Sequence, residues 1–240
     1  MKGFDLEDFD IGLHELEIDE TSLNDFDIEF ADDTDIETRY LKPRLVLIKN
    51  KFVKYENAEK LAKEVQIKKN ERIHCIVSGN FVFGDFIGAY LTNHNIKAKN
   101  MTINTLSLSA DNVDMLQAMI ELGYIDKLNL IVSHYFYQHN RNTIVKKIYD
   151  DLDNDKDNFN LAVASTHCKI VNFKTYDDKY IVIYGSANMR SSSNIEQFTI
   201  EENKELYDFY ESINTKIIDK FNTINKAVRY KDMRNAIFEN

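Results

Sequence analysis

Short apolar runs alternate with amphipathic stretches from residue 45 onward, and this alternation most constrains the fold. The runs predict strands at residues 45–48, 73–77, 101–106, 128–132, 161–164 and 179–184. Helical patterns lie between them at residues 57–65, 83–93, 111–123 and 142–152. Strands that alternate with helices are typical of an α/β sandwich. We therefore expect a mostly parallel sheet flanked by helices.

The chain beyond residue 204 predicts a long C-terminal helix. Its apolar residues recur at steps of 3 or 4 positions: Leu206, Tyr210, Ile213, Ile217, Phe221, Ile224 and Val228. This spacing places them on one helical stripe. The chain has 240 residues, 43% of them hydrophobic, which is enough to bury one substantial core. We expect a single folded domain over residues 38–240.

Charge divides the chain at residue 37. Residues 1–37 hold 15 Asp or Glu and one Lys, whereas the remainder holds 25 acids and 29 Lys or Arg. The low-complexity, acid-rich composition of residues 1–37 predicts a disordered acidic tail. The rest of the chain has a formal charge of +4, so the overall charge of −10 does not argue against a nucleic-acid substrate.

The tail contains a repeated tetrapeptide. Asp-Phe-Asp-Ile occurs at residues 8–11 and again at residues 25–28. Acidic–hydrophobic alternation is typical of segments that dock onto a protein partner. A solubilising leader that repels itself is an equally good interpretation, and both stay open.

Cysteine usage and hydropathy predict a cytoplasmic protein. Cys75 and Cys168, the two cysteines of the chain, lie in apolar runs and are expected to be buried spacers rather than a disulfide. No apolar run approaches the ~20 residues that cross a bilayer. The N-terminus is acidic where a secretory signal would be basic and then apolar. We expect no membrane association.

The segment from Ser165 to Gln197 carries most of the recognisable chemistry. His167 and Lys169 are two residues apart, which would place them on one face of a strand. The run at residues 179–184 is expected to pair antiparallel to that strand. Four further polar or turn residues follow it: Gly185, Ser186, Asn188 and Glu196. Together these residues provide what is needed to hold and attack a phosphate diester without a metal.

Each residue of this group has a chemical reason to be there. Gly185 would let the backbone approach an anion closely, and the Ser186 and Asn188 side chains would donate to phosphate oxygens. Glu196 would accept the Nδ1–H of a histidine and leave Nε2 free to attack phosphorus. Taken singly, these residues also fit a strand histidine, a solvated cation and an ordinary turn. The ordered set favours a phosphate site.

This ordered set closely resembles the signature of the phospholipase D-like superfamily. The residues that match are His167-x-Lys169, Gly185-Ser186-x-Asn188 and Glu196. The order of strands and helices over residues 70–200 is also similar to one such domain. The family's usual aspartate after the lysine has no clear equivalent, although Asp177 and Asp178 are candidates in a hairpin-like insertion. Some nuclease members dispense with that aspartate.

The resemblance implies a mechanism with two histidines. One attacks phosphorus to form a phosphohistidine, while its partner protonates the leaving oxygen and then activates water. Because this chain has one signature, the resemblance implies a homodimer with two copies of His167 at a two-fold axis. No cofactor or metal is required. His134 and His139 flank a polar-aromatic stretch and either line the cleft or serve packing and surface roles.

Single-signature chains of this length resemble the endonuclease branch of the superfamily. We therefore expect a nucleic-acid substrate, DNA rather than RNA, with Arg141 and Arg190 near the substrate channel. Two alternatives stay open. One is a catalytically silent module of the same fold that binds nucleic acid or protein. The other is a phosphodiesterase that acts on a lipid or another small diester.

Overall fold

The computed structural model describes residues 49–55, 57–69, 71–77, 81–153, 157–190 and 194–223. Several predictions fall elsewhere in the chain and lie outside these described residues. They are the acidic tail at residues 1–37, the strand at 45–48 and the end of the apolar stripe at Ile224 and Val228.

One eight-stranded sheet organises the described part of the chain, in the order β1-β2-β8-β7-β6-β3-β4-β5. The strands are β1 (Lys49–Tyr55), β2 (Glu71–Val77), β3 (Ala98–Thr105), β4 (Leu128–Ser133), β5 (Phe159–Ala164), β6 (Ile170–Thr175), β7 (Tyr180–Gly185) and β8 (Glu196–Glu202). The helices are α1 (Ala58–Glu64), α2 (Phe83–Asn93), α3 (Ala110–Glu121), α4 (His134–His139), α5 (Ile144–Leu152) and α6 (Lys204–Phe221). The predicted α/β sandwich is confirmed.

The balance of strand directions differs from the prediction of a mostly parallel sheet. Within the described sheet, β1–β2, β3–β4 and β4–β5 pair in parallel, and the other four junctions are antiparallel. The cause is the run of β6, β7 and β8, which follow one another without an intervening helix and so reverse direction at each step. The predicted antiparallel pairing of residues 179–184 with the preceding segment is confirmed as β6–β7.

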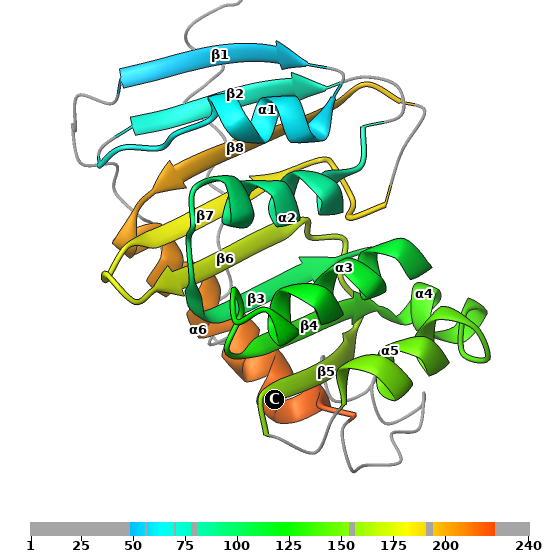
Figure 1. Cartoon of the computed structure of the whole chain (residues 1–240). Helices are drawn as coiled ribbons and strands as arrows, with labels where there is room; N and C mark the ends of the chain where they lie inside the picture. The colour runs from blue at the N-terminus through cyan, green and yellow to red at the C-terminus, as the bar shows by residue number, and fades with distance from the viewer. Residues whose placement is uncertain are drawn as a thin grey trace, which may run out of the picture. The chain divides into compact units, whose positions relative to one another are not determined.

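Helices cover both faces of the sheet. Figure 1 shows α1, α2, α3 and α5 on one face, while α6 crosses the other. Helix α6 contacts β3, β4, β5, β6 and β7, so it spans the middle and one side of the sheet. No helix among the described residues combines the length and apolar character needed to cross a bilayer.

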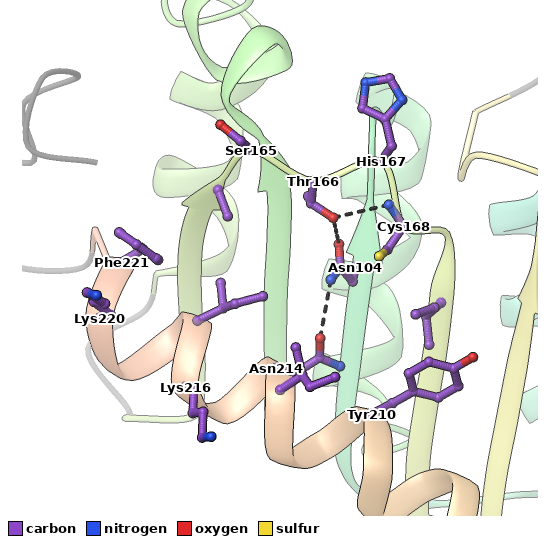
Figure 2. Close-up of a pocket in the computed structure, with 14 residues that line it drawn as sticks. Asn104, Ser165, Thr166, His167, Cys168, Tyr210, Asn214, Lys216, Lys220 and Phe221 are labelled. Atoms are coloured by element: carbon purple, nitrogen blue, oxygen red, sulfur yellow. Dashed lines mark hydrogen bonds between the residues drawn. The ribbon is translucent and has the colours of Figure 1, made fainter. Parts of the chain in front are cut away.

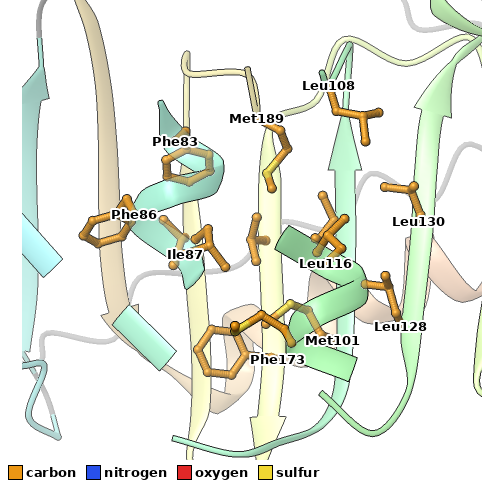
Figure 3. Packing of buried hydrophobic residues seen from close by; sticks show 14 of the residues in the cluster. Phe83, Phe86, Ile87, Met101, Leu108, Leu116, Leu128, Leu130, Phe173 and Met189 are labelled. Carbon is orange, nitrogen blue, oxygen red and sulfur yellow. The ribbon is translucent and has the colours of Figure 1, made fainter. Parts of the chain in front are cut away.

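The two faces of the sheet differ in polarity. On the α2 and α3 face, Phe86, Ile87 and Leu116 pack onto apolar strand residues such as Phe173, and all four are buried (Figure 3). Burial of such side chains is worth about 1.5–3 kcal/mol each and supplies the main core. On the α6 face, β3 presents Asn100, Thr102 and Asn104, whose alternation follows the two-residue period of a strand.

The C-terminal helix is shorter than its apolar stripe predicts. Helix α6 ends at Phe221 because Asn222 is extended and the Thr223 N–H donates to the Leu161 carbonyl at 2.7 Å. The chain therefore turns back onto β5. Ile213, in the middle of the stripe, is 45% exposed, so the stripe is only partly covered.

Candidate active site

The residues singled out by the sequence gather along one edge of the sheet. Strands β4, β5 and β7 end there, and β6 and β8 begin there (right-hand side of Figure 1). Residues 165–169 connect β5 to β6 at this edge. Gly185 is the last residue of β7, and Glu196 is the first residue of β8. Two sequence-distant halves of the motif thus come to one place.

His167 and Lys169 lie in a loop, and their prediction as strand residues was wrong. Strand β5 stands at the edge of the sheet, and β6 is separated from it by β3 and β4. The chain must cross both strands before it rejoins the sheet at Ile170, so residues 165–169 cannot belong to a ladder. Lys169 Nζ donates to the His167 carbonyl oxygen at 2.8 Å, and the His167 side chain is exposed.

The same loop corrects one cysteine prediction. Cys75 in β2 is buried, as expected, and burial raises the pKa of its thiol to about 12. Cys168 follows His167 in the loop and is exposed. The apolar run that suggested a buried strand begins two residues later, at Ile170.

Gly185 joins the loop to the neighbouring strands. Its N–H donates to the Lys169 carbonyl at 3.1 Å, which closes β7 onto the end of the loop. A Cβ at this position would lie 2.2 Å from the Gln197 carbonyl oxygen and 2.6 Å from Phe198 Cα. A side chain therefore cannot fit between β7 and β8. The glycine is explained here by strand packing, a reason different from the anion approach that the sequence suggested.

Ser186 and Glu196 are in direct contact. Ser186 Oγ donates to Glu196 Oε2, and the Gln197 N–H donates to Ser186 Oγ at 3.0 Å. The Ser186 N–H in turn donates to the Gln197 carbonyl at 2.9 Å. Among the described contacts, the Glu196 carboxylate is thus engaged by a serine, and the expected contact with the His167 imidazole is not formed.

Asn188 and Arg190 extend this cluster. Both line a small cavity together with Phe81 and Glu196. Asn188 Oδ1 is buried and has no hydrogen-bond partner among the described residues. An unsatisfied buried amide oxygen costs about 1–3 kcal/mol, so the amide retains unused bonding capacity beside Glu196. Arg190 is exposed at this cavity.

Arg141, the other predicted substrate-binding residue, is not brought into this cluster by any described contact. It lies exposed in the connection between α4 and α5. The nearby His139 Nδ1 donates to the Tyr135 carbonyl at 2.8 Å within its own helix. Burial lowers the pKa of His134, the first residue of α4.

Asp177 and Asp178, the candidates for the family's aspartate, lie at the opposite end of β6 from the loop that carries His167. They form the turn between β6 and β7, where Asp177 pairs with Lys179 at 2.7 Å and Asp178 with Lys174 at 2.8 Å. The Lys179 contact lowers the pKa of Asp177. They serve the hairpin and stand apart from the candidate site.

An apolar groove beside the loop was not predicted. It has a volume of about 470 Å³ and lies between residues 164–168 and the stripe of α6 (Figure 2). Tyr210, Ile213 and Ile217 line it from α6, and Lys216 and Lys220 are its cationic residues. No Asp or Glu is among its described lining residues. In Figure 2 the His167 ring points away from α6.

The described residues contain no group of three or more His, Cys, Asp or Glu side chains arranged to hold a metal ion. The groups present at the site are an exposed imidazole, an ammonium, a hydroxyl bonded to a carboxylate, and an amide. These groups can bind the oxygens of a phosphate diester and present a nitrogen nucleophile to its phosphorus.

No protein-family model matches the chain, and no curated protein matches it in sequence. Solved structures are similar in part. Nuc, a phospholipase D family member from Salmonella typhimurium, is 15% identical, with a TM-score of 0.38 over 50% of this chain and 78% of its own. NucT from Helicobacter pylori is 18% identical, with a TM-score of 0.39 over 51% of this chain and 80% of its own.

Phosphatidylserine synthase from Haemophilus influenzae is 12% identical, with a TM-score of 0.44 over 63% of this chain and 39% of its own. Identities and TM-scores this low do not identify a function. We therefore base the function on the residues of the site.

Proposed function

We propose that this chain is a metal-independent phosphodiesterase of the phospholipase D-like type that cleaves nucleic acid, with DNA as the favoured substrate. The observation that carries this assignment is the bonded connection between the two halves of the motif. Lys169 Nζ bonds the His167 carbonyl, and the Lys169 carbonyl bonds the Gly185 N–H. Ser186, the next residue, bonds Glu196.

In the proposed reaction, His167 Nε2 attacks phosphorus and a P–N bond forms as the bond to the leaving oxygen breaks. A second histidine gives its proton to that oxygen. It then takes a proton from water, which attacks the phosphohistidine and restores the free imidazole. Lys169 retains two ammonium protons beyond its bond to the His167 carbonyl. These protons, with Ser186 and Asn188, would stabilise the extra charge on the phosphate oxygens.

The second histidine is proposed to come from a second copy of the chain. His167 is the one histidine in the sequence with a lysine two positions later. His94 Nε2 donates to the Ala62 carbonyl at 2.8 Å, and His74 Nδ1 is 2.9 Å from Thr199 Oγ1, so both are engaged elsewhere in the fold. An exposed His167 is accessible to the same residue of another subunit.

Two features favour a polyanionic substrate over a small diester. Residues 38–240 carry a formal charge of +4. The groove beside the loop has two lysines and no acidic residue among its described lining. Lysines near the loop that carries His167 raise the local concentration of a polyanion and speed its association.

The experiment is cleavage of plasmid and oligonucleotide DNA in EDTA by the wild type and by His167→Ala. We expect the wild type to cleave in EDTA and the variant to be inactive. His139→Gln is the matched control, because this exposed histidine is bonded within its own helix, and it should retain activity. Wild-type activity that disappears in EDTA and returns with Mg²⁺ would refute the histidine mechanism.

The catalytically silent alternative gains support from one observation, the engagement of Glu196 by Ser186 instead of His167. It predicts that the wild type and His167→Ala bind DNA equally and that neither cleaves it. The same assay, run with a binding measurement, separates the two functions.

A further inference from the structure

Five hydrogen bonds run without interruption from the His167 loop to helix α6. The first three appear as dashed lines in Figure 2. The Cys168 N–H donates to Thr166 Oγ1 at 3.1 Å, and the Thr166 hydroxyl donates to Asn104 Oδ1 at 2.9 Å. Asn104 Nδ2 then donates to Asn214 Oδ1 on α6 at 3.2 Å.

The remaining two bonds end on a carboxylate. Asn214 Nδ2 donates to Asn172 Oδ1 at 3.2 Å, and Asn172 Nδ2 donates to Glu211 Oε2 at 2.6 Å. We call these six residues the relay. Every donor lies on the loop side of its acceptor, so each bond polarises the next. The last bond is charge-assisted, which makes it the strongest kind in such a series.

The four residues between the two ends of the relay are buried. Thr166 is 8% exposed, while Asn104, Asn172 and Asn214 are between 0 and 2% exposed. Burial of polar groups is unfavourable unless they are fully paired, and an apolar interface would satisfy helix packing equally well. The opposite faces of β3 and β6 are apolar, with Ile103 and Phe173 in the core. Simple packing of α6 therefore does not account for the polar side chains.

The loop end of the relay surrounds His167 in the sequence. Thr166 precedes His167 and Cys168 follows it. The Cys168 N–H donates a hydrogen bond to the Thr166 hydroxyl oxygen. Such a side-chain bond from residue i to the N–H of residue i+2 closes a small turn. His167 is the middle residue of this turn, and its carbonyl oxygen accepts a hydrogen bond from Lys169 Nζ. Its backbone is held while its imidazole is exposed.

We propose that Thr166 and Asn104 are positioning residues that hold the turn carrying His167 in place for attack on phosphorus, with α6 as the anchor through Asn214. This inference rests on the proposed function, in which His167 is the nucleophile. A reacting group misplaced by about 1 Å can cost ~10²-fold in rate. Loss of the turn should therefore lower kcat much more than it alters substrate binding.

The test replaces Thr166 with valine, which has the same shape but lacks the hydroxyl. Thr175→Val is the matched control. Thr175 is also buried. It is the last residue of β6, the strand that follows the loop, and its hydroxyl bonds Asp177 and the Lys179 N–H at the opposite sheet edge. Both variants should lower Tm by similar amounts. Only Thr166→Val should lower kcat for bis(4-nitrophenyl) phosphate, by about 10- to 100-fold with KM nearly unchanged, and Thr166→Ser should restore most of the loss.

A second readout does not depend on activity. The Cys168 N–H donates to Thr166 Oγ1 within the turn, so hydrogen–deuterium exchange of this amide, followed by NMR, reports on the turn. The amide should exchange several-fold faster in Thr166→Val than in the wild type or Thr175→Val, because it loses its acceptor and the turn opens more often. A Cys168 exchange rate and a kcat that both stay at wild-type values in Thr166→Val would overturn the inference, as would equal losses of kcat in the two valine variants.

Failure of the proposed function gives a different pattern. A wild type that hydrolyses neither the small diester nor DNA overturns that function and, with it, the catalytic role of the turn. An active wild type with an unaffected Thr166→Val leaves the proposed function standing and removes only the positioning role.

Discussion

At the scale of single residues, the candidate site depends on side-chain contacts and on one close approach between β7 and β8. Ser186 donates a hydrogen bond to Glu196, whereas the partner expected for the glutamate was a histidine. Glycine is required at position 185 because a Cβ there would lie 2.2 Å from the Gln197 carbonyl oxygen. Which backbone atoms come near a glycine depends on strand pairing, and no local pattern encodes that.

Lys169 gives the most direct residue-scale prediction. Replacement by alanine should lower kcat for DNA cleavage by about 10²–10³-fold, because it removes a charged donor worth about 3–4 kcal/mol if it acts like one oxyanion-hole group. Lys179→Ala is the control, since Lys179 pairs with Asp177 in the β6–β7 turn. Steady-state kinetics of both variants provide the measurement. Equal rates for the two variants would remove Lys169 from the site.

At the scale of elements, most helices and the buried strands were predictable, but β6–β7 was the one specific strand pair predicted. The apolar runs at residues 73–77, 128–132 and 161–164 coincide with β2, β4 and β5. Strand β8 was missed because its sequence, Glu196–Glu202, has acids at both ends and resembles a polar connection. It is nevertheless the strand that joins β2 to β7 and thereby places Glu196 beside Ser186.

The relay also could not be predicted from the sequence. Its asparagines come from β3, β6 and α6, which are separated by about 40 to 110 positions in the sequence. Alternation along β3 marks Thr102 and Asn104 as one face, and polarity predicts that this face is exposed to solvent. Instead α6 covers it. Only the three-dimensional arrangement reveals that buried amides connect the His167 loop to a helix.

At the scale of the whole molecule, the proposed two-histidine mechanism requires two chains per site, because each chain has one signature. Light scattering should give twice the chain mass of 28.1 kDa. Excess His167→Ala subunits, mixed and re-equilibrated with wild type, should suppress cleavage, because each mixed dimer has a single copy of His167. A monomer whose cleavage rate is first order in enzyme and insensitive to the added variant contradicts this arrangement.

The proposed mechanism requires that His167 becomes covalently bonded to phosphorus. The most direct measurement is rapid alkaline quenching of the enzyme during oligonucleotide cleavage in EDTA, followed by intact-mass and peptide-mapping mass spectrometry. We predict a nucleotide adduct on the peptide that contains His167, formed and lost at rates matching turnover and missing in His167→Ala. Active enzyme that completes a single turnover with no adduct on this peptide at any time point would contradict the account.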